Sequence, residues 1–319
     1  MKDYNLEFHC YQTVYKWKDK HFGLVISDEI HDALSPQYSK FFYNNSYEAI
    51  IGLSATINRN TEYQLPDGEI ITKGKLLDDI APVCFRYKIS DGQQDGTARR
   101  LNVYVITHKL EDRVKTIKSG SSKKSFYQTE KAAYDYWNSR YLKSFYIEDE
   151  DAKKFNIRLC TMKRNNILYN LESKIPIVKK LLDNLESKTI IFGNSLDILL
   201  KITPNVVSSR NKDDVNDSII SKFDKGNFKQ IASFKKLKQG KNLVGLDNCI
   251  ITSYYSTDKD YIQRIGRLRN NKERGHVFIL VTQGTQEEVW LKKIFENIDN
   301  INVIYCPDVD FAIKKYKEW

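Results

Sequence analysis

The first hydrophobic pattern along the chain is a pair of short apolar runs that each end in small or polar residues. Residues 22–27 read FGLVIS and residues 48–53 read EAIIGL. Continuous apolar runs of this length are typical of parallel strands that are buried on both faces. The carboxyl ends of such strands face the ligand crevice of an open α/β sheet. The pattern therefore predicts two parallel strands that direct the residues after them toward a binding site.

From Leu171 onward, apolar runs of strand length alternate with segments whose apolar residues recur at helical spacing. The predicted strands are residues 188–195, 204–209, 229–234, 248–255 and 276–282, and the predicted helices are residues 175–186, 215–226, 258–271 and 285–298. Strands that alternate with helices indicate a parallel sheet covered on both faces. Thr285 and Glu288 have the spacing of a capping box at the start of the last helix.

The middle of the chain has a different character. Residues 101–110 read LNVYVITHKL and predict a strand that leads out of the first unit. Residues 111–170 are basic and rich in aromatic side chains, four of which recur at helical spacing, namely Tyr134, Trp137, Tyr141 and Phe145. Two interpretations stay open, the core face of an amphipathic helix and an arm that stacks on bases. Helical spacing favours the first. The expected organisation is one unit at 1–110, an insertion or linker at 111–170 and a second unit at 171–319.

Composition places the chain among ordinary globular proteins, with 41% hydrophobic and 29% charged residues. No apolar run reaches the about 18 residues expected of a membrane helix, so no membrane partner is expected. The first ten residues lack the pattern of a secretory signal. The five cysteines form no CxxC pair, which argues against a zinc site or a disulfide framework. We therefore expect a cytoplasmic protein.

Net charge adds a candidate partner. The chain carries a formal charge of +10, which favours a polyanion. Much of the excess lies in two windows: residues 222–241 contain seven lysines and one aspartate, and residues 111–170 contain thirteen basic and eight acidic residues. This distribution is compatible with nucleic-acid binding.

Three polar segments carry candidate chemistry. Asp28 and Glu29 follow the first predicted strand, where an aspartate can hold Mg²⁺ and a glutamate can polarise a water. Ser54 and Thr56 follow the second strand, where hydroxyl groups can bond to the acidic pair. The segment YIQRIGRLRN at 261–270 supplies several cations, and an arginine from a second domain can neutralise charge on a γ-phosphate. Taken singly, these segments also fit helix caps, a plain turn and a solvated basic helix.

Together the three segments carry a resemblance to a known family. SDEIHDAL, GLSATI and YIQRIGRLR resemble motifs II, III and VI of the superfamily 2 helicases, the DEAD/DEAH-box class. TIIFGNS at 189–195 is similar to motif IV, and FKKLKQGKNLVGLD at 234–247 to motif V. The resemblance covers residues 8–283 and is closest to phage and repair helicases of the UvsW/XPB kind and to restriction-enzyme motors. It implies an α/β fold of two RecA-like parallel-sheet domains, with a helical insertion between them.

The resemblance assigns catalytic and coupling roles by motif. It implies that Asp28 coordinates Mg²⁺ through water and that Glu29 is the catalytic base for ATP hydrolysis. It implies that His31 and Gln263 couple the ATP site to the domain interface and that Arg267 is an arginine finger.

Further roles follow from the same motifs. Ser54 and Thr56 would link hydrolysis to movement on nucleic acid. The nucleotide-binding residues would be Gly240, Asn242, Arg264 and Arg269. The lysines of motif V would contact the nucleic-acid backbone, namely Lys235, Lys236, Lys238 and Lys241.

The sequence departs from the family pattern at three places. Asn270 stands where motif VI usually ends in arginine, with Arg269 one place earlier, and Asn242 replaces the aspartate of motif V. No GxxxxGK[ST] phosphate loop (Walker A, motif I) occurs in the 319 residues. The resemblance therefore implies a first RecA-like domain that is incomplete at its N-terminus, and a second polypeptide is one source for the phosphate-loop half.

The function expected from this resemblance is an ATP-dependent DNA helicase or translocase. It would use ATP and Mg²⁺ and act on DNA rather than RNA, in phage-type replication, recombination or repair. It would work in the cytoplasm, that of the host if a phage encodes it. Two alternatives stay open: a non-catalytic nucleic-acid-binding adaptor that descends from a helicase, and the motor of a restriction system.

Overall fold

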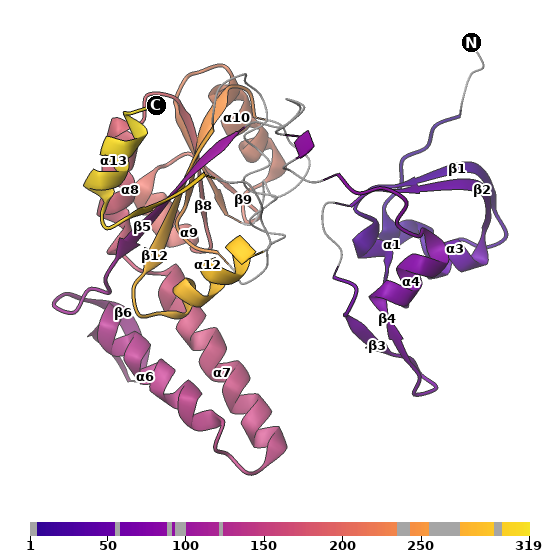
Figure 1. The fold of residues 1–319 in the computed structure, drawn as a ribbon, viewed down its shortest axis with the longest axis horizontal. Helices are drawn as coiled ribbons and strands as arrows, with labels where there is room; N and C mark the ends of the chain where they lie inside the picture. Colours follow the sequence, from indigo (N-terminus) through magenta and orange to yellow (C-terminus); the bar gives the residue numbers. More distant parts are fainter. Residues whose placement is uncertain are drawn as a thin grey trace. The chain divides into compact units, whose positions relative to one another are not determined.

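The computed structural model describes residues 5–54, 58–87, 91–92, 100–120, 124–234, 243–254, 275–296 and 302–319. The chain divides into two compact units, Met1–Tyr87 and Lys88–Trp319, which are treated separately below (Figure 1).

The first unit contains a two-stranded parallel sheet, β1 (His21–Ser27) and β2 (Ser46–Gly52), paired from His21 opposite Ser46 to Ser27 opposite Gly52. Its remaining elements are α1 (Tyr11–Val14), α2 (Ile30–Ala33), α3 (Lys40–Asn44), α4 (Lys73–Ile80) and the antiparallel pair β3 (Glu62–Gln64) and β4 (Ile70–Thr72). Both strands predicted from the apolar runs are therefore confirmed, as is their parallel direction.

One face of this small sheet is covered by helices. Phe22, Val25 and Ile50 are partly buried against a core made of residues from α1 to α4, among them Phe41 and Leu77. The opposite face carries Leu24, Ile26 and Ile51, which are 52%, 58% and 46% exposed. The expectation that these strands are buried on both faces is therefore wrong for the part of the chain that the structure describes, because helices pack on one face alone.

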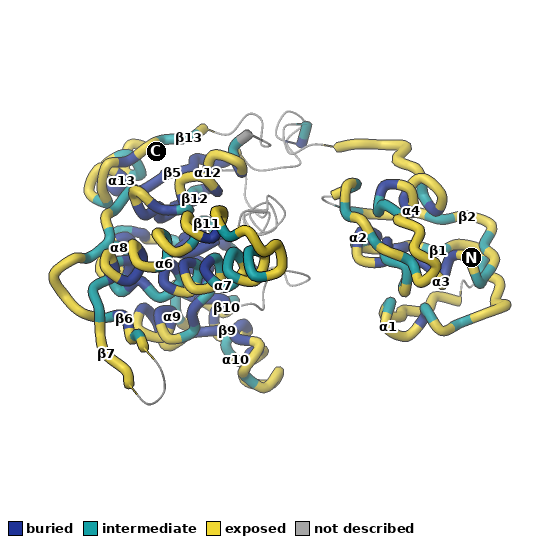
Figure 2. Tube along the Cα trace, turned by 90° about the horizontal axis from the view of Figure 1, so that it is seen from below, coloured by how far each residue is buried: buried dark blue, intermediate teal, exposed yellow. Residues whose placement is uncertain are grey.

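The second unit is built on a seven-stranded parallel sheet with the order β13-β5-β12-β11-β8-β10-β9. Its strands are β5 (Leu101–His108), β8 (Lys188–Gly193), β9 (Val206–Ser208), β10 (Gln230–Phe234), β11 (Leu246–Ile251), β12 (Gly275–Thr282) and β13 (Asn302–Cys306). Each pairing between neighbours is parallel. The parallel sheet predicted from the alternating pattern is thus confirmed, and Figure 2 shows its strands as largely buried.

Helices cover both faces of this sheet. They are α8 (Lys174–Asn184), α9 (Leu196–Ile202) and α13 (Val309–Tyr316) on one face, and α10 (Asp213–Asp224) and α12 (Gln286–Glu296) on the other. Successive residues of β5 alternate between the two cores, with Val103 and Val105 in one and Tyr104 and Ile106 in the other. This alternation follows from the twofold side-chain period of a strand that is buried on both sides.

The position of β5 differs from the expected organisation. Residues 101–110 were expected to close the first unit, but β5 pairs with β12 from Leu101 to His108 and with β13 on its other side. The reason is physical. A strand with apolar side chains on both faces needs a neighbour on each side and a helical layer above and below, and the large sheet provides all of these.

The segment after β5 forms a hairpin and a pair of helices. Strands β6 (Lys115–Gly120) and β7 (Ser125–Thr129) are antiparallel and lead into α6 (Glu130–Ser144) and α7 (Glu150–Tyr169), which lie side by side (Figure 1). Of the aromatic residues predicted to form a core stripe, Tyr134 is buried and Trp137 is partly buried, whereas Phe145 is exposed. The core interpretation therefore holds for the start of α6 and fails toward its end.

None of the described helices has the length and apolar character that a bilayer crossing requires.

Candidate functional site

The residues after β1 and β2 meet at the same edge of the small sheet. The backbone N–H of Leu53 donates to the carbonyl of Ser27 at 2.9 Å, and the N–H of Ile30 donates to the carbonyl of Leu53 at 2.9 Å. The Ile30 side chain packs over Gly52, where a Cβ would lie 2.6 Å from Ile30 Cδ1 and the Ile30 side chain would have to shift. The sheet geometry thus brings the SDEIH segment against the start of the SAT segment.

Asp28 lies at the exposed end of β1 and is held from two sides. The Tyr11 hydroxyl lies 2.6 Å from the Asp28 carbonyl oxygen and 2.6 Å from Ser27 Oγ. Burial raises the pKa of Tyr11, so that its hydroxyl stays protonated and can donate. The Asp28 carboxylate accepts a hydrogen bond from the Glu29 backbone at 3.0 Å through Oδ1. Tyr11 therefore fixes the backbone from which the Asp28 carboxylate projects.

Glu29 has a left-handed backbone conformation, with φ 48° and ψ 46°. For a residue other than glycine this conformation costs about 1–2 kcal/mol, so the surrounding contacts must hold it in place. The Glu29 side chain lies beside His31, with Oε2 at 3.1 Å from His31 Nδ1. That oxygen is buried and accepts no hydrogen bond within the described part of the chain. Glu29 thus presents a carboxylate oxygen with spare acceptor capacity, as a general base requires.

His31 is almost completely buried and contacts three polar side chains. Its Nδ1 lies 2.7 Å from Ser54 Oγ, and its Nε2 lies 3.1 Å from Asp32 Oδ1. Because a carboxylate only accepts, Nε2 carries a proton when it bonds to Asp32. In the neutral ring Nδ1 then accepts from the Ser54 hydroxyl, and in the doubly protonated ring Nδ1 faces the Glu29 carboxylate. His31 can therefore alternate its Nδ1 contact between Ser54 and Glu29.

The Ser54 hydroxyl meets the first segment at His31, and the predicted bond to the acidic pair stays a prediction. Ser54 contacts His31, and Lys73 at the start of α4 donates to the His31 carbonyl at 2.9 Å. Lys73 and Tyr11 lie outside the motifs, and their role was missed because only the folded chain brings them to this edge.

The residues at this edge are compatible with a magnesium ion. Among the described residues no group of three acidic, histidine or cysteine side chains could hold a metal alone. Magnesium, however, keeps several waters and takes one or two carboxylates together with substrate phosphates. Asp28 is exposed, and its Oδ2 atom is free of the backbone contact that Oδ1 makes. Asp28 would therefore be the residue that holds Mg²⁺, which supplies charge neutralisation at the phosphates.

The other predicted site residues lie outside the described residues. They are Thr56, Lys235, Lys236, Lys238, Gly240, Lys241, Asn242, Gln263, Arg264, Arg267 and Arg269.

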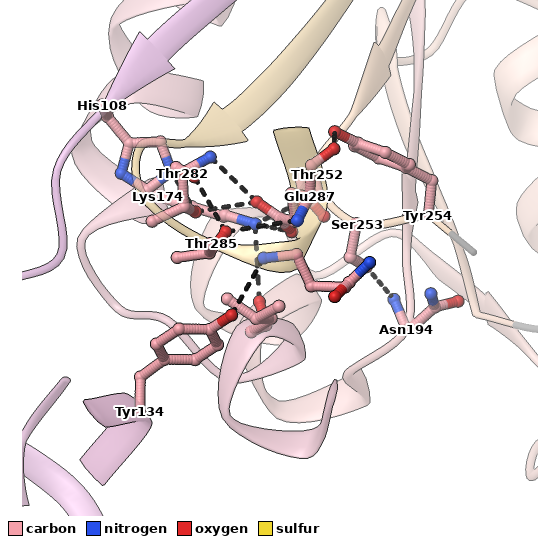
Figure 3. Close-up of polar contacts among 12 residues, drawn as sticks. His108, Tyr134, Lys174, Asn194, Thr252, Ser253, Tyr254, Thr282, Thr285 and Glu287 are labelled. Atoms are coloured by element: carbon pink, nitrogen blue, oxygen red, sulfur yellow. Dashed lines mark hydrogen bonds and ion pairs between the residues drawn. The ribbon is translucent and has the colours of Figure 1, made fainter. Parts of the chain in front are cut away.

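The second unit contains a buried polar network at the carboxyl end of its sheet (Figure 3). The Lys174 ammonium group donates to Glu287 Oε1 at 2.7 Å, to the Thr252 carbonyl at 2.8 Å and to the Leu168 carbonyl at 3.4 Å. Both charged side chains are buried, at 2% and 0% exposure. All three ammonium protons therefore have an acceptor, which a desolvated ion pair needs to be stable.

Glu287 connects this ion pair to neighbouring strands. Its Oε2 accepts from the Thr282 backbone N–H at 2.9 Å and from the Thr282 hydroxyl at 2.7 Å, and its carbonyl accepts from the Tyr254 hydroxyl at 3.0 Å. Thr285 Oγ1 accepts from the Glu287 N–H at 3.3 Å and donates to the Thr282 carbonyl. The predicted capping box with Glu288 is therefore wrong in its partner, because Glu287 turns inward to meet Lys174.

His108 completes the network at the end of β5. Its Nε2 lies 3.0 Å from Thr282 Oγ1. Its Nδ1 lies 3.3 Å from the Lys109 carbonyl, so the tautomer of the ring decides which of the two nitrogens donates. Burial, together with the nearby Lys174 charge, lowers the pKa of His108 to about 3, so that the ring is neutral at physiological pH. Sequence patterns did not reveal this network because its members come from distant segments.

Comparisons with known proteins place these observations in a family context. Residues 173–272 match the helicase conserved C-terminal domain. The DNA 3'-5' translocase XPB2 of Sulfurisphaera tokodaii is 23% identical over 281 residues, which cover 83% of this chain and 60% of that protein. The chain thus spans less than two thirds of the length of the curated relative it matches.

Solved structures share the fold. The structure of S. cerevisiae Dbp5 bound to RNA and ADP BeF3 has a TM-score of 0.56 at 13% identity, over 93% of this chain and 63% of that one. A variant of the same yeast protein bound to the same ligands has a TM-score of 0.53 at 14% identity, with the same coverage. At these identities the likeness concerns the fold alone, and it confirms the predicted α/β architecture of RecA-like parallel sheets. Residues 173–272 thus match the helicase conserved C-terminal domain, as the motifs in that part of the chain predicted.

Proposed function

We propose that this chain is the part C-terminal to motif I of an ATP-dependent DNA helicase or translocase. The observation that carries the proposal is the cluster at the end of β1 and β2. It places the spare oxygen of Glu29 beside His31 and joins His31 to Ser54. Glu29 can accept a proton from water, and the His31 ring beside it contacts Ser54, which follows the neighbouring strand. This arrangement is suited to activating water and to coupling the reaction to the segment after β2.

The proposed roles of Asp28, Glu29, His31 and Ser54 agree with the described geometry, and those of the other residues rest on the helicase motifs alone. Asp28 would hold Mg²⁺, Glu29 would take the proton of the attacking water, and His31 and Ser54 would pass on the state of the site. From the second unit, Arg267 would neutralise charge on the γ-phosphate and Gln263 would act beside it, with nucleotide contacts from Gly240, Asn242, Arg264 and Arg269. Thr56 would act with Ser54. The lysines of motif V, Lys235, Lys236, Lys238 and Lys241, would contact the DNA backbone.

The proposal includes DNA as the nucleic acid, a phage-type role in replication, recombination or repair, and a place of action in the cytoplasm. A DNA translocase among the relatives supports DNA over RNA.

The test is ATP hydrolysis with and without DNA. It should be measured on the chain alone and on the assembly isolated from its own cells through a C-terminal tag on this chain. The expected result is hydrolysis by the assembly that rises when duplex DNA is added. An assembly that binds DNA but shows no ATP turnover in any condition would contradict the proposal.

The second candidate function is a nucleic-acid-binding adaptor, which would bind DNA without hydrolysing ATP. The observation that favours it is Asn270 in the position that motif VI usually gives to arginine. An adaptor would bind DNA with a steep dependence on salt, and ATP would change neither its affinity nor its position on DNA.

A further inference from the structure

The helical pair α6 and α7, here called the arm, extends from the second unit and has two antiparallel helices (Figure 1). Their register follows from contacts along the pair: Arg164 donates to Asn138 at 2.7 Å and its guanidinium lies 3.7 Å from the Tyr141 ring centre, and Ser144 Oγ lies 3.9 Å from Cys160 Sγ. The arm is therefore a packed structure that can present side chains at fixed positions.

The charges on the arm are of one sign along most of its length. Residues 136–147 and 152–169 contain seven basic residues and no acidic residue. The acidic residues of the arm gather at 148–151, between the helices, and near its base. There Glu130 is buried against backbone N–H groups, and Asp135 pairs with Lys131. Apart from Lys153, which pairs with Glu150 at the start of α7, the body of both helices thus offers cations without an ion pair to a carboxylate of the arm.

Two of these cations lie against aromatic rings in one cluster, made of Tyr136, Trp137, Arg140 and Lys163. The Arg140 guanidinium lies 5.4 Å from the Trp137 ring centre and 5.9 Å from that of Tyr136, and the Lys163 ammonium lies 5.8 Å from the Trp137 ring centre. Arg140 also donates to the Tyr136 hydroxyl at 3.1 Å. The Tyr136 and Trp137 rings meet edge to face at 5.2 Å. We call these four residues the cation–aromatic cluster.

Neither cation of the cluster has an ion pair with a carboxylate among the residues that the structure describes. The pKa of Arg140 is raised by its hydrogen bond to the Tyr136 hydroxyl, rather than by an acidic neighbour. Arg140 and Lys163 are exposed, and Tyr136 is 50% exposed. The ring contacts hold the two cations in position while leaving N–H groups directed to solvent, which lowers the entropy cost of binding an anion.

We propose that the cation–aromatic cluster binds the phosphodiester backbone of nucleic acid. The inference deepens the proposed function, on which it rests, by naming a contact surface outside the helicase motifs. Phosphate groups are the anions that a guanidinium recognises best, and backbone contacts of this kind are independent of sequence. Lys143, Lys154 and Arg158 are exposed on the same two helices and extend the surface along the arm. A series of cations along two helices suits a polymer whose negative charges repeat.

The test compares the salt dependence of DNA binding by the full chain and its variants. Arg140→Gln with Lys163→Gln removes both cations at exposed positions. The matched control is Lys179→Gln with Lys314→Gln, which removes the same charge from exposed residues of α8 and α13. A fluorescently labelled duplex of mixed sequence is titrated over a range of salt concentrations without nucleotide, and thermal unfolding confirms that the variants are folded.

The expected result is weaker binding by the cluster variant and a slope of log affinity against log salt that is smaller by about 2, since each lost phosphate contact reduces the slope by about 0.9. The control variant should keep the wild-type slope. Tyr136→Ala, which keeps both charges but removes the ring and the hydroxyl that hold Arg140, should weaken binding several-fold at an almost unchanged slope.

Three outcomes overturn the inference. If the cluster variant keeps the wild-type slope, the cluster does not contact the DNA backbone. The proposed function is unaffected by this result, because the chain still binds DNA. If the slope of log affinity against log salt falls equally in the cluster and control variants, the net charge of the chain alone determines the salt dependence of DNA binding. Binding of a polyglutamate peptide with the same affinity and slope as DNA makes an acidic protein the better occupant. Failure of the wild-type chain to bind DNA at all contradicts the proposed function itself.

Discussion

His31 Nδ1 lies 2.7 Å from Ser54 Oγ, so that α2, which follows β1, is joined by a hydrogen bond to the segment that follows β2. The same nitrogen lies 3.1 Å from Glu29 Oε2. The two contacts share one nitrogen, so Ser54 and Glu29 compete for it. This competition for His31 could couple a change at the Glu29 carboxylate to the segment that follows β2.

Replacing Ser54 with alanine should destabilise the first unit. The substitution removes one contact of a buried ring nitrogen, and a hydrogen bond of this kind contributes about 0.5–1.5 kcal/mol. Hydrogen exchange of peptides from β2 and α2 reports the local effect. Ser54→Thr, which keeps the hydroxyl group, is the matched control and should lose less protection. Equal protection in the alanine variant and the wild type would show that the His31–Ser54 contact does not hold this edge.

The buried pair Lys174–Glu287 should show strong coupling in stability. Lys174→Met leaves the Glu287 carboxylate desolvated without its ammonium partner, and breaking a buried pair in this way costs about 3–5 kcal/mol. The double variant, Lys174→Met with Glu287→Gln, removes both charges and should be more stable than either single variant. Hydrogen exchange in peptides of β11 and β12 measures the effect in this unit. Additive losses in the double variant would show that the two residues do not depend on each other.

His108 should make the second unit sensitive to acid. Its pKa is about 3 in the fold and near 6.5 in an unfolded chain, so the unfolded state binds the extra proton between these values. The contribution of neutral His108 is therefore fully present above pH 6.5 and is lost as pH falls toward 3, at up to about 1.4 kcal/mol per pH unit.

His108→Gln supplies the comparison for this prediction. The glutamine amide can donate to Thr282 Oγ1 and does not titrate. The unfolding free energy of the wild type minus that of the variant should become smaller as the pH is lowered from 7 to 5. Parallel stability curves for the two proteins would show that His108 is not the titrating group.

The sequence predicted the parts of this structure that local pattern determines. Both small-sheet strands, the large-sheet strands other than β13, and the helices α8, α10 and α12 were predicted from apolar periodicity, as was the place of Asp28 and Glu29 at a strand end. The elements β13, α9 and α13 and the contact of His31 with Ser54 were not predicted, and the predicted helix at 258–271 lies outside the described residues.

What the sequence could not predict depends on contacts between distant segments. Nothing near Lys174 indicates that its ammonium group meets Glu287, 113 positions later, because each alone reads as an exposed charge. The assignment of β5 to the large sheet depends on pairing with β12, which the alternation of side chains alone does not specify. Within α6, aromatic spacing could not distinguish the buried Tyr134 from the exposed Phe145, since that depends on where the neighbouring sheet ends.

The proposal that Glu29 activates water for ATP hydrolysis is tested most directly by Glu29→Gln in the assembly isolated through this chain. Single-turnover hydrolysis and ATP binding should be measured on the same preparation, with DNA present. The amide has nearly the shape of the carboxylate but cannot accept a proton, so hydrolysis should fall by about 10²–10⁴ while ATP binding is retained. Hydrolysis that continues at the wild-type rate in this variant would contradict the account.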